Sequence, residues 1–136
     1  MEEINKLETS IPSSYSNLHL VERFIEQIIA TFEMPEKVQS DLMLALVEVS
    51  YNALLPDPRE TVQKFAKFTA VKNRRKIVVT IEESGNGFDY THPPCPLSKE
   101  REGLTGRSIY VMAALTDELR FIDKGRKIVM SFALDR

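Results

Sequence analysis

The segment between Pro35 and Pro56 places the strongest constraint on the fold of this chain. Proline followed by an acidic residue is typical of a helix start, and the Pro-Asp-Pro run that begins at Pro56 ends helical structure. The centre of this predicted helix, residues 42–49, is apolar on all sides except at Glu48. A helix with this pattern is normally buried. Other elements of the chain must therefore cover it.

The rest of the sequence supplies a short series of further elements. Alternating runs predict strands, and apolar residues at helical spacing predict helices. The expected elements are a strand at 3–12, a helix that follows the candidate caps at 13–17 and stops before Pro35, a helix at 35–55, strands at about 62–71 and 76–83, a helix at 106–115, and strands at 118–123 and 126–134. This order predicts an α+β fold: a two-layer α/β sandwich with a mixed, mostly antiparallel sheet, helices on one face, and a single domain over residues 1–136.

The composition excludes several classes of protein. Of the 136 residues, 18 are Lys or Arg and 20 are Asp or Glu, and this balance argues against a nucleic-acid-binding surface. The single Cys95 excludes an intramolecular disulfide framework and a multi-cysteine zinc site. No run approaches the roughly 20 apolar residues that cross a bilayer, and no terminal segment has the pattern of a signal peptide. We therefore expect a cytoplasmic protein that contacts neither membrane nor nucleic acid directly.

Glu48 is the first candidate functional residue. It is the only charged residue between Asp41 and Asp57, and glutamate is rarely buried unless it is paired or used chemically. Asn52 follows one helical turn later, so both side chains project from the same helix face. A carboxylate beside an amide oxygen suits a divalent cation with a water or hydroxyl next to it. The alternative is a surface glutamate with a local asparagine partner.

Two glycine-containing segments provide the other candidates. The strand at 76–83 ends in Glu83, and Gly85 and Gly87 in the following loop allow the backbone to approach a ligand closely. Further along, Gly106-Arg107-Ser108 opens a helix, whose amide N–H groups and dipole favour a phosphate and whose arginine adds positive charge. The corresponding alternatives are a glycine turn and a plain loop-to-helix junction.

Together and in this order, the three segments resemble the N, G1 and G2 boxes of the GHKL ATPase superfamily, which shares the Bergerat ATP-binding fold. The matching stretches are Glu48-Val49-Ser50-Tyr51-Asn52-Ala53, Glu83-Ser84-Gly85-Asn86-Gly87-Phe88-Asp89 and Gly106-Arg107-Ser108-Ile109-Tyr110-Val111-Met112. Within the superfamily, the chain is most similar to the small anti-sigma factor serine/threonine kinases of the RsbW and SpoIIAB type. This similarity extends over nearly the whole chain.

The resemblance implies a role for each matching position. Asn52 would coordinate Mg²⁺, and Glu48 would be the catalytic residue that polarises the attacking serine hydroxyl. Glu83 would read the adenine amino group of ATP. The other residues implied in nucleotide binding are Gly85 and Gly87 over the base, Gly106, Arg107 and Ser108 around the phosphates, and Ser131 near the adenine. Residues 91–105 would form the ATP lid.

The resemblance further implies an ATP-dependent serine/threonine kinase that phosphorylates an anti-anti-sigma factor of the STAS type, binds a sigma factor and forms a homodimer. Three departures from the family pattern leave an alternative open. The G1 acid is normally Asp and is Glu83 here, the second glycine of the G2 box is Ser108, and Leu55-Pro56 stands where the family often has His. The alternative is a protein-binding regulator of the same fold with weak or no ATP binding.

Overall fold

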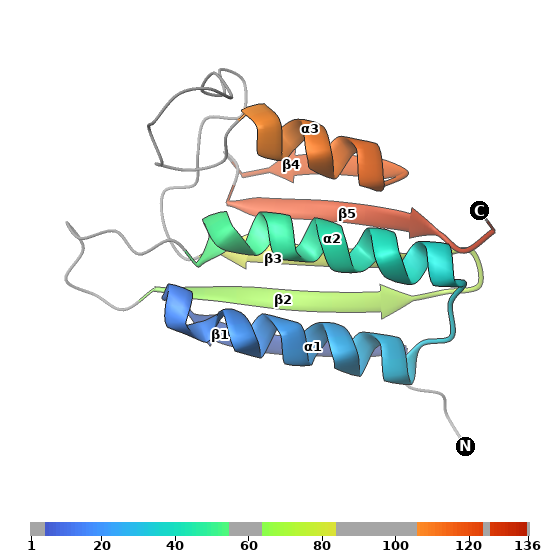
Figure 1. The fold of residues 1–136 in the computed structure, drawn as a ribbon, viewed down its shortest axis with the longest axis horizontal. Coiled ribbons are helices and arrows are strands. Elements are labelled where there is room, and N and C mark those ends of the chain that lie inside the picture. Colours follow the sequence, from blue (N-terminus) through green and yellow to red (C-terminus); the bar gives the residue numbers. More distant parts are fainter. Residues whose placement is uncertain (1–4, 55–63, 84–105, 124–125, 136) are drawn as a thin grey trace.

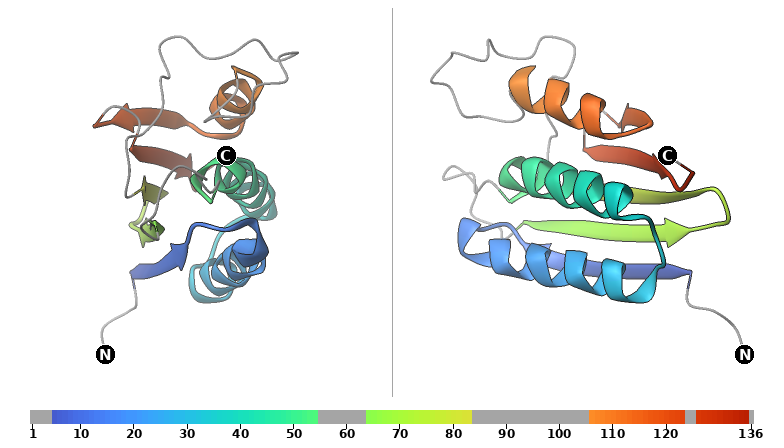
Figure 2. Two further views of the ribbon diagram at one scale, coloured as in Figure 1. Left: turned by 90° about the vertical axis from the view of Figure 1, so that its left-hand side faces the viewer. Right: turned by 45° about the vertical axis from the view of Figure 1, so that its right-hand side comes forward.

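The computed structural model describes residues 5–54, 64–83, 106–123 and 126–135. All described strands belong to one sheet, and the three α-helices lie against one face of it (Figures 1 and 2). The elements in chain order are β1 (Lys6–Pro12), a short 3₁₀ helix η1 (Tyr15–Asn17), α1 (Leu18–Thr31), α2 (Glu36–Ala53), β2 (Phe65–Lys72), β3 (Lys76–Glu83), α3 (Gly106–Leu115), β4 (Glu118–Ile122) and β5 (Lys127–Ala133). The predicted two-layer α/β sandwich is confirmed.

The strand order of the sheet is β1-β2-β3-β5-β4, and each of these described pairings is antiparallel. β3 is therefore the central strand. The turn between β2 and β3 forms around Asn73, whose side-chain oxygen accepts hydrogen bonds from the backbone N–H groups of Arg75 and Lys76 at 2.8 and 2.9 Å. This side-chain-to-backbone pattern is typical of a tight turn, and the turn joins the two strands that the sequence predicts on either side of it.

The start of α1 is tied to the end of β1 by polar contacts. Ser14 accepts a hydrogen bond from the Ser16 N–H and so caps η1. Asn17 is the N-cap residue of α1, but its side chain makes no cap bond. Its Nδ2 instead donates to the Pro12 carbonyl at 2.9 Å. This contact connects the strand and the helix that pack together at one edge of the sandwich.

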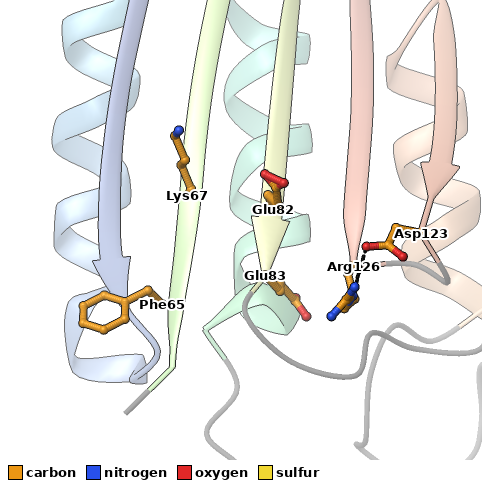
Figure 3. A pocket seen from close by; sticks show the side chains of 6 residues that line it. All are labelled: Phe65, Lys67, Glu82, Glu83, Asp123 and Arg126. Atoms are coloured by element: carbon orange, nitrogen blue, oxygen red, sulfur yellow. Dashed lines mark hydrogen bonds and ion pairs between the residues drawn. The ribbon is translucent and has the colours of Figure 1, made fainter. Parts of the chain in front are cut away.

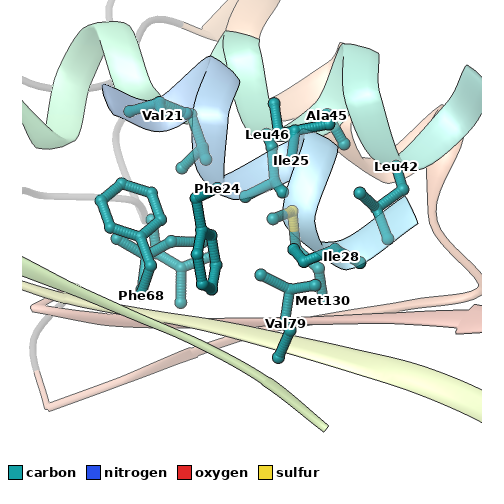
Figure 4. Packing of buried hydrophobic residues seen from close by; sticks show 14 of the residues in the cluster. Val21, Phe24, Ile25, Ile28, Leu42, Ala45, Leu46, Phe68, Val79 and Met130 are labelled. Carbon is teal, nitrogen blue, oxygen red and sulfur yellow. The ribbon is translucent and has the colours of Figure 1, made fainter. Parts of the chain in front are cut away.

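The core lies between the helix layer and the sheet. Along β3, Ile77, Val79 and Ile81 are fully buried and alternate with more accessible residues, as expected for a strand covered on one face. Helices α1 and α2 contribute apolar side chains that meet this row (Figure 4). The labelled members of the cluster are Val21, Phe24, Ile25, Ile28, Leu42, Ala45, Leu46, Phe68, Val79 and Met130.

Helix α2 lies between α1 and α3 in the helix layer (Figure 1). Its inner face is buried, but Met43, Leu44 and Tyr51 on its outer face are exposed. The prediction that this helix is buried on all sides is therefore wrong for its outer face. A two-layer sandwich covers a helix from below and from its two sides, and it leaves the fourth side open.

Within the described residues, none of the helices combines the length and the apolar character that crossing a membrane requires.

Candidate functional site

Glu48 and Ser108, which are far apart in the sequence, meet in the structure. Ser108 lies in the first turn of α3, and its Oγ donates a hydrogen bond to Glu48 Oε1 on α2 at 2.8 Å. Ser108 is 7% exposed, and Glu48 is half-buried. The two helices pack side by side (Figure 1). The start of α3 therefore lies next to the residue that the sequence identified as a candidate base.

The other predicted residues on α2 and α3 are within four residues of Glu48 or Ser108 in the sequence. Asn52 is in α2, one turn beyond Glu48, but its side chain is outside the described part of the structure. Gly106 and Arg107 are the first residues of α3, which begins where the sequence predicted it. The side chain of Arg107 is also outside the described part. The backbone N–H groups of a helix start lack intrahelical partners, and they favour negative charge.

Glu83 is the last residue of β3, and its backbone N–H donates to the Arg126 carbonyl at 2.7 Å. It continues the row of Ile77, Val79 and Ile81, which faces the helices, whereas Glu82 is exposed on the other face. Burial raises the pKa of Glu83 to about 7, and the positive charge of Lys64 opposes this rise. The carboxyl group is therefore partly protonated near neutral pH and can both donate and accept hydrogen bonds.

The raised pKa predicts a pH-dependent stability. Because the folded state keeps a proton on Glu83 up to a higher pH than the unfolded state does, the free energy of unfolding falls as the pH rises from the ordinary pKa of 4.5 through about 7. One pKa unit corresponds to about 1.4 kcal/mol, so we expect a loss of about 1–3 kcal/mol over this window relative to Glu83→Gln. Urea denaturation of both proteins below pH 4.5 and above pH 7 measures the difference. Parallel pH profiles would contradict a buried, titrating Glu83.

An open pocket of about 360 Å³ lies at this end of the sheet (Figure 3). It is lined by Phe65, Lys67, Glu82, Glu83, Asp123 and Arg126. Asp123 has a positive φ of 55°, and its Oδ2 accepts from Arg126 Nη2 at 2.6 Å. The pocket volume falls within the range of small-molecule sites. The sequence reasoning did not identify Phe65, Asp123 or Arg126, because only the pairing of β3 with β5 brings the turn after β4 to Glu83.

Ser131 is not brought to this site. It pairs with Val78 on β3 and with Glu118 on β4, several residues along the sheet from Glu83. The neighbouring residues Met130 and Phe132 face the core, so alternation turns Ser131 to the face that carries no helices. It is nevertheless buried, at 6% exposed. Position and sheet face both separate Ser131 from Glu83 in this structure, and its expected place beside the adenine stays a prediction.

The remaining predicted residues are not tested by the described structure. Gly85 and Gly87, together with the predicted lid at 91–105, lie outside the described residues. Among the described side chains, no group of three or more His, Cys, Asp or Glu residues could hold a metal ion. The Asn52 amide oxygen, one helical turn from Glu48, nevertheless suits Mg²⁺, which prefers oxygen ligands and usually takes only one or two from the protein, the rest from phosphates and water. The donor chemistry of α2 thus fits this ion.

The chain was compared with models of known protein families and with curated proteins. The family model of the histidine kinase-like ATPase domain matches residues 11–132, which extend from the end of β1 almost to the end of β5. No curated protein matches the chain. Domains of this family bind ATP together with Mg²⁺, and in this chain the N-box helix and the start of the G2 helix are in contact through Glu48 and Ser108. The chain belongs to the histidine kinase-like ATPase family of the GHKL superfamily.

Proposed function

We propose that this chain is a protein kinase of the anti-sigma factor type, which binds ATP with Mg²⁺ and transfers the γ-phosphoryl group to a serine or threonine of a partner protein. The observation that carries the proposal is the 2.8 Å hydrogen bond from Ser108 Oγ to Glu48 Oε1. It supports the proposal because the Glu48 carboxylate accepts a hydrogen bond from a serine hydroxyl, that of Ser108 in the first turn of α3. A general base needs this distance to the proton that it removes.

The residues of the site have separate tasks in this proposal. Glu48 accepts the proton of the attacking hydroxyl, and the backbone N–H groups at the start of α3 stabilise negative charge on the phosphates. Glu83 and the end of β3 hold the nucleotide base. Mg²⁺, held by Asn52, would neutralise phosphate charge when bound. Phosphoryl transfer requires mainly positioning and charge neutralisation, so this small set of groups is sufficient.

The proposed partners are an anti-anti-sigma factor as substrate and a sigma factor that the chain sequesters in the cytoplasm, with the chain acting as a homodimer. Support comes from the resemblance of the three boxes and from the outer face of α2, where Met43, Leu44 and Tyr51 are exposed. Exposed apolar side chains that share one helix face are a common feature of protein contact surfaces.

A second candidate function is a protein-binding regulator that shares the fold and binds ATP weakly or not at all. The raised pKa of Glu83 favours it, because a partly neutral acid at the end of β3 differs from the ionised aspartate of the usual G1 box. Ser108 favours it as well, because its side chain stands where the family has a glycine.

Titration calorimetry with ATP and Mg²⁺ distinguishes the two functions. We expect the wild-type chain to bind, and Asn52→Ala to bind about tenfold or more weakly, because a metal ligand is lost. Asn73→Ala is the matched control: it removes an asparagine side chain at the β2–β3 turn, at the opposite end of the sheet from the end of α2 (Figure 1), and should leave the affinity unchanged. Equal affinities for wild type and Asn52→Ala would contradict the role of Asn52. No binding to the wild type would favour the regulator.

A further inference from the structure

We propose that Ser108 is itself a phosphorylation site, which accepts the γ-phosphoryl group of ATP bound to the same chain with Glu48 as the base. The inference rests on the proposed ATP binding and goes beyond it, because the acceptor belongs to the kinase chain and not to a partner.

The contact between Ser108 and Glu48 favours phosphoryl transfer to Ser108. A hydroxyl and a base within about 2.6–3.2 Å form the arrangement that activates a nucleophile, and Ser108 Oγ lies 2.8 Å from Glu48 Oε1. Two other hydroxyls in the described residues differ. Ser50 in α2 and Thr116 just after α3 each donate to the backbone carbonyl four residues earlier, the ordinary partner of a helical hydroxyl. Ser108 reaches a carboxylate on a different helix.

The location of Ser108 also favours phosphoryl transfer to it. It lies in the first turn of α3, at the segment that matches the G2 box, next to the helix end that favours phosphate. A phosphate carried by a residue in the first turn of a helix is stabilised by the same backbone N–H groups and by the helix dipole. The start of α3 thus favours the approach of the γ-phosphate to Ser108.

In the transfer to Ser108, one bond forms at the γ-phosphorus and one breaks. Ser108 Oγ forms a bond to the γ-phosphorus, the bond between that phosphorus and the bridging oxygen to the β-phosphate breaks, and ADP leaves with the electron pair of this bond. Glu48 Oε1 takes the hydroxyl proton. The products are phosphoserine at position 108, ADP and one proton, which passes from Glu48 to solvent.

Phosphorylation of Ser108 would weaken further nucleotide binding by the same chain. Phosphoserine carries about two negative charges, and at Ser108 these would lie beside the Glu48 carboxylate and at the same helix start that the nucleotide phosphates need. Like charges in a partly buried site repel each other strongly. We therefore expect the phosphorylated chain to take up one phosphoryl group and to bind nucleotide about tenfold or more weakly than the unmodified chain.

Mass spectrometry of the full chain after incubation with ATP and Mg²⁺ tests the proposal, with ATP affinity measured in parallel for each protein. We expect the wild type to gain one phosphoryl group, located by fragmentation at Ser108. Ser108→Ala should gain none, whereas Ser108→Thr, which keeps a hydroxyl, should be modified. Thr116→Ala, one residue after the end of the same helix, is the matched control and should be modified like the wild type. The repurified phosphorylated chain should show the weakened ADP binding.

A mixing experiment tests whether base and acceptor act in one chain. Glu48→Gln keeps the acceptor, and Ser108→Ala keeps the base, so a mixture of the two should remain unmodified. Phosphoryl transfer in this mixture would overturn the arrangement within one chain. ATP binding without modification of Ser108, or with modification elsewhere, would overturn the assignment of the acceptor while leaving the proposed ATP binding intact. Absence of ATP binding by the wild type would overturn both proposals.

Discussion

Replacing Glu48 with glutamine is expected to slow phosphoryl transfer about 10²- to 10⁴-fold, the usual contribution of a general base. Glutamine has the same shape, and its amide oxygen can still accept the hydrogen bond that Ser108 Oγ donates at 2.8 Å in the wild type. The local geometry is therefore kept, and only the ability to take the proton is lost. Formation of ADP at saturating ATP, followed in a single turnover, measures the rate.

Two further measurements make this prediction specific. ATP affinity should change little in Glu48→Gln, because the base acts on the hydroxyl and does not hold the nucleotide. Glu26→Gln, a matched change of an exposed residue on α1, should leave both rate and affinity unchanged. If Glu48→Gln lost affinity and rate to the same extent, Glu48 would be a binding residue. An unchanged rate would remove it from the chemistry.

Replacing Phe68 with alanine is expected to lower the free energy of unfolding by about 3–5 kcal/mol, as for other large-to-small changes of buried aromatic residues. Phe68 is fully buried, and its ring meets that of Phe24 at 6.2 Å in an edge-to-face arrangement that adds to the loss. A domain of this size is stable by only about 5–15 kcal/mol, so the variant should be close to unfolding. Urea denaturation measures the change.

Phe65 provides the control for this prediction. It lies on the same strand, three residues before Phe68, but on the opposite face of the sheet, and it is 46% exposed. Phe65→Ala should therefore lower the free energy of unfolding by less than about 1 kcal/mol, since a partly exposed side chain leaves little cavity. Equal losses for the two variants would contradict the assignment of the two sheet faces.

The boundaries of several elements could be predicted closely because their signals are local. β3 occupies residues 76–83 and α3 occupies residues 106–115, as predicted from alternation and from a glycine start. The first strand and β2 begin later than expected, at Lys6 and Phe65. Alternation alone does not specify where pairing with a neighbouring strand begins, so strand ends are less certain than strand centres.

The contacts of the site depend on packing and could be predicted only in part. The sequence identified Glu48 and Ser108 separately, but the hydrogen bond between them spans 60 residues of sequence and requires α2 and α3 to lie side by side. The sheet face of Ser131 is set by the register of β5 against β3, which local patterns do not specify. The shift in the pKa of Glu83 likewise arises from burial, which no local pattern reveals.

The order of strands also has a consequence for how copies of the protein can associate. The outermost strands among the described residues are β1 and β4, and an outer strand of a sheet can add a strand from another molecule. Lys6 and Glu8 place charges on β1, where Glu8 contacts Lys67 at 3.6 Å, and Pro12 ends that strand without an N–H donor. β4 is only five residues long. These edges are poor templates for a continuous intermolecular sheet. We therefore expect any homodimer to form through side-chain surfaces. Substitutions on such a surface should weaken the homodimer, whereas changes at the edges of β1 and β4 should not.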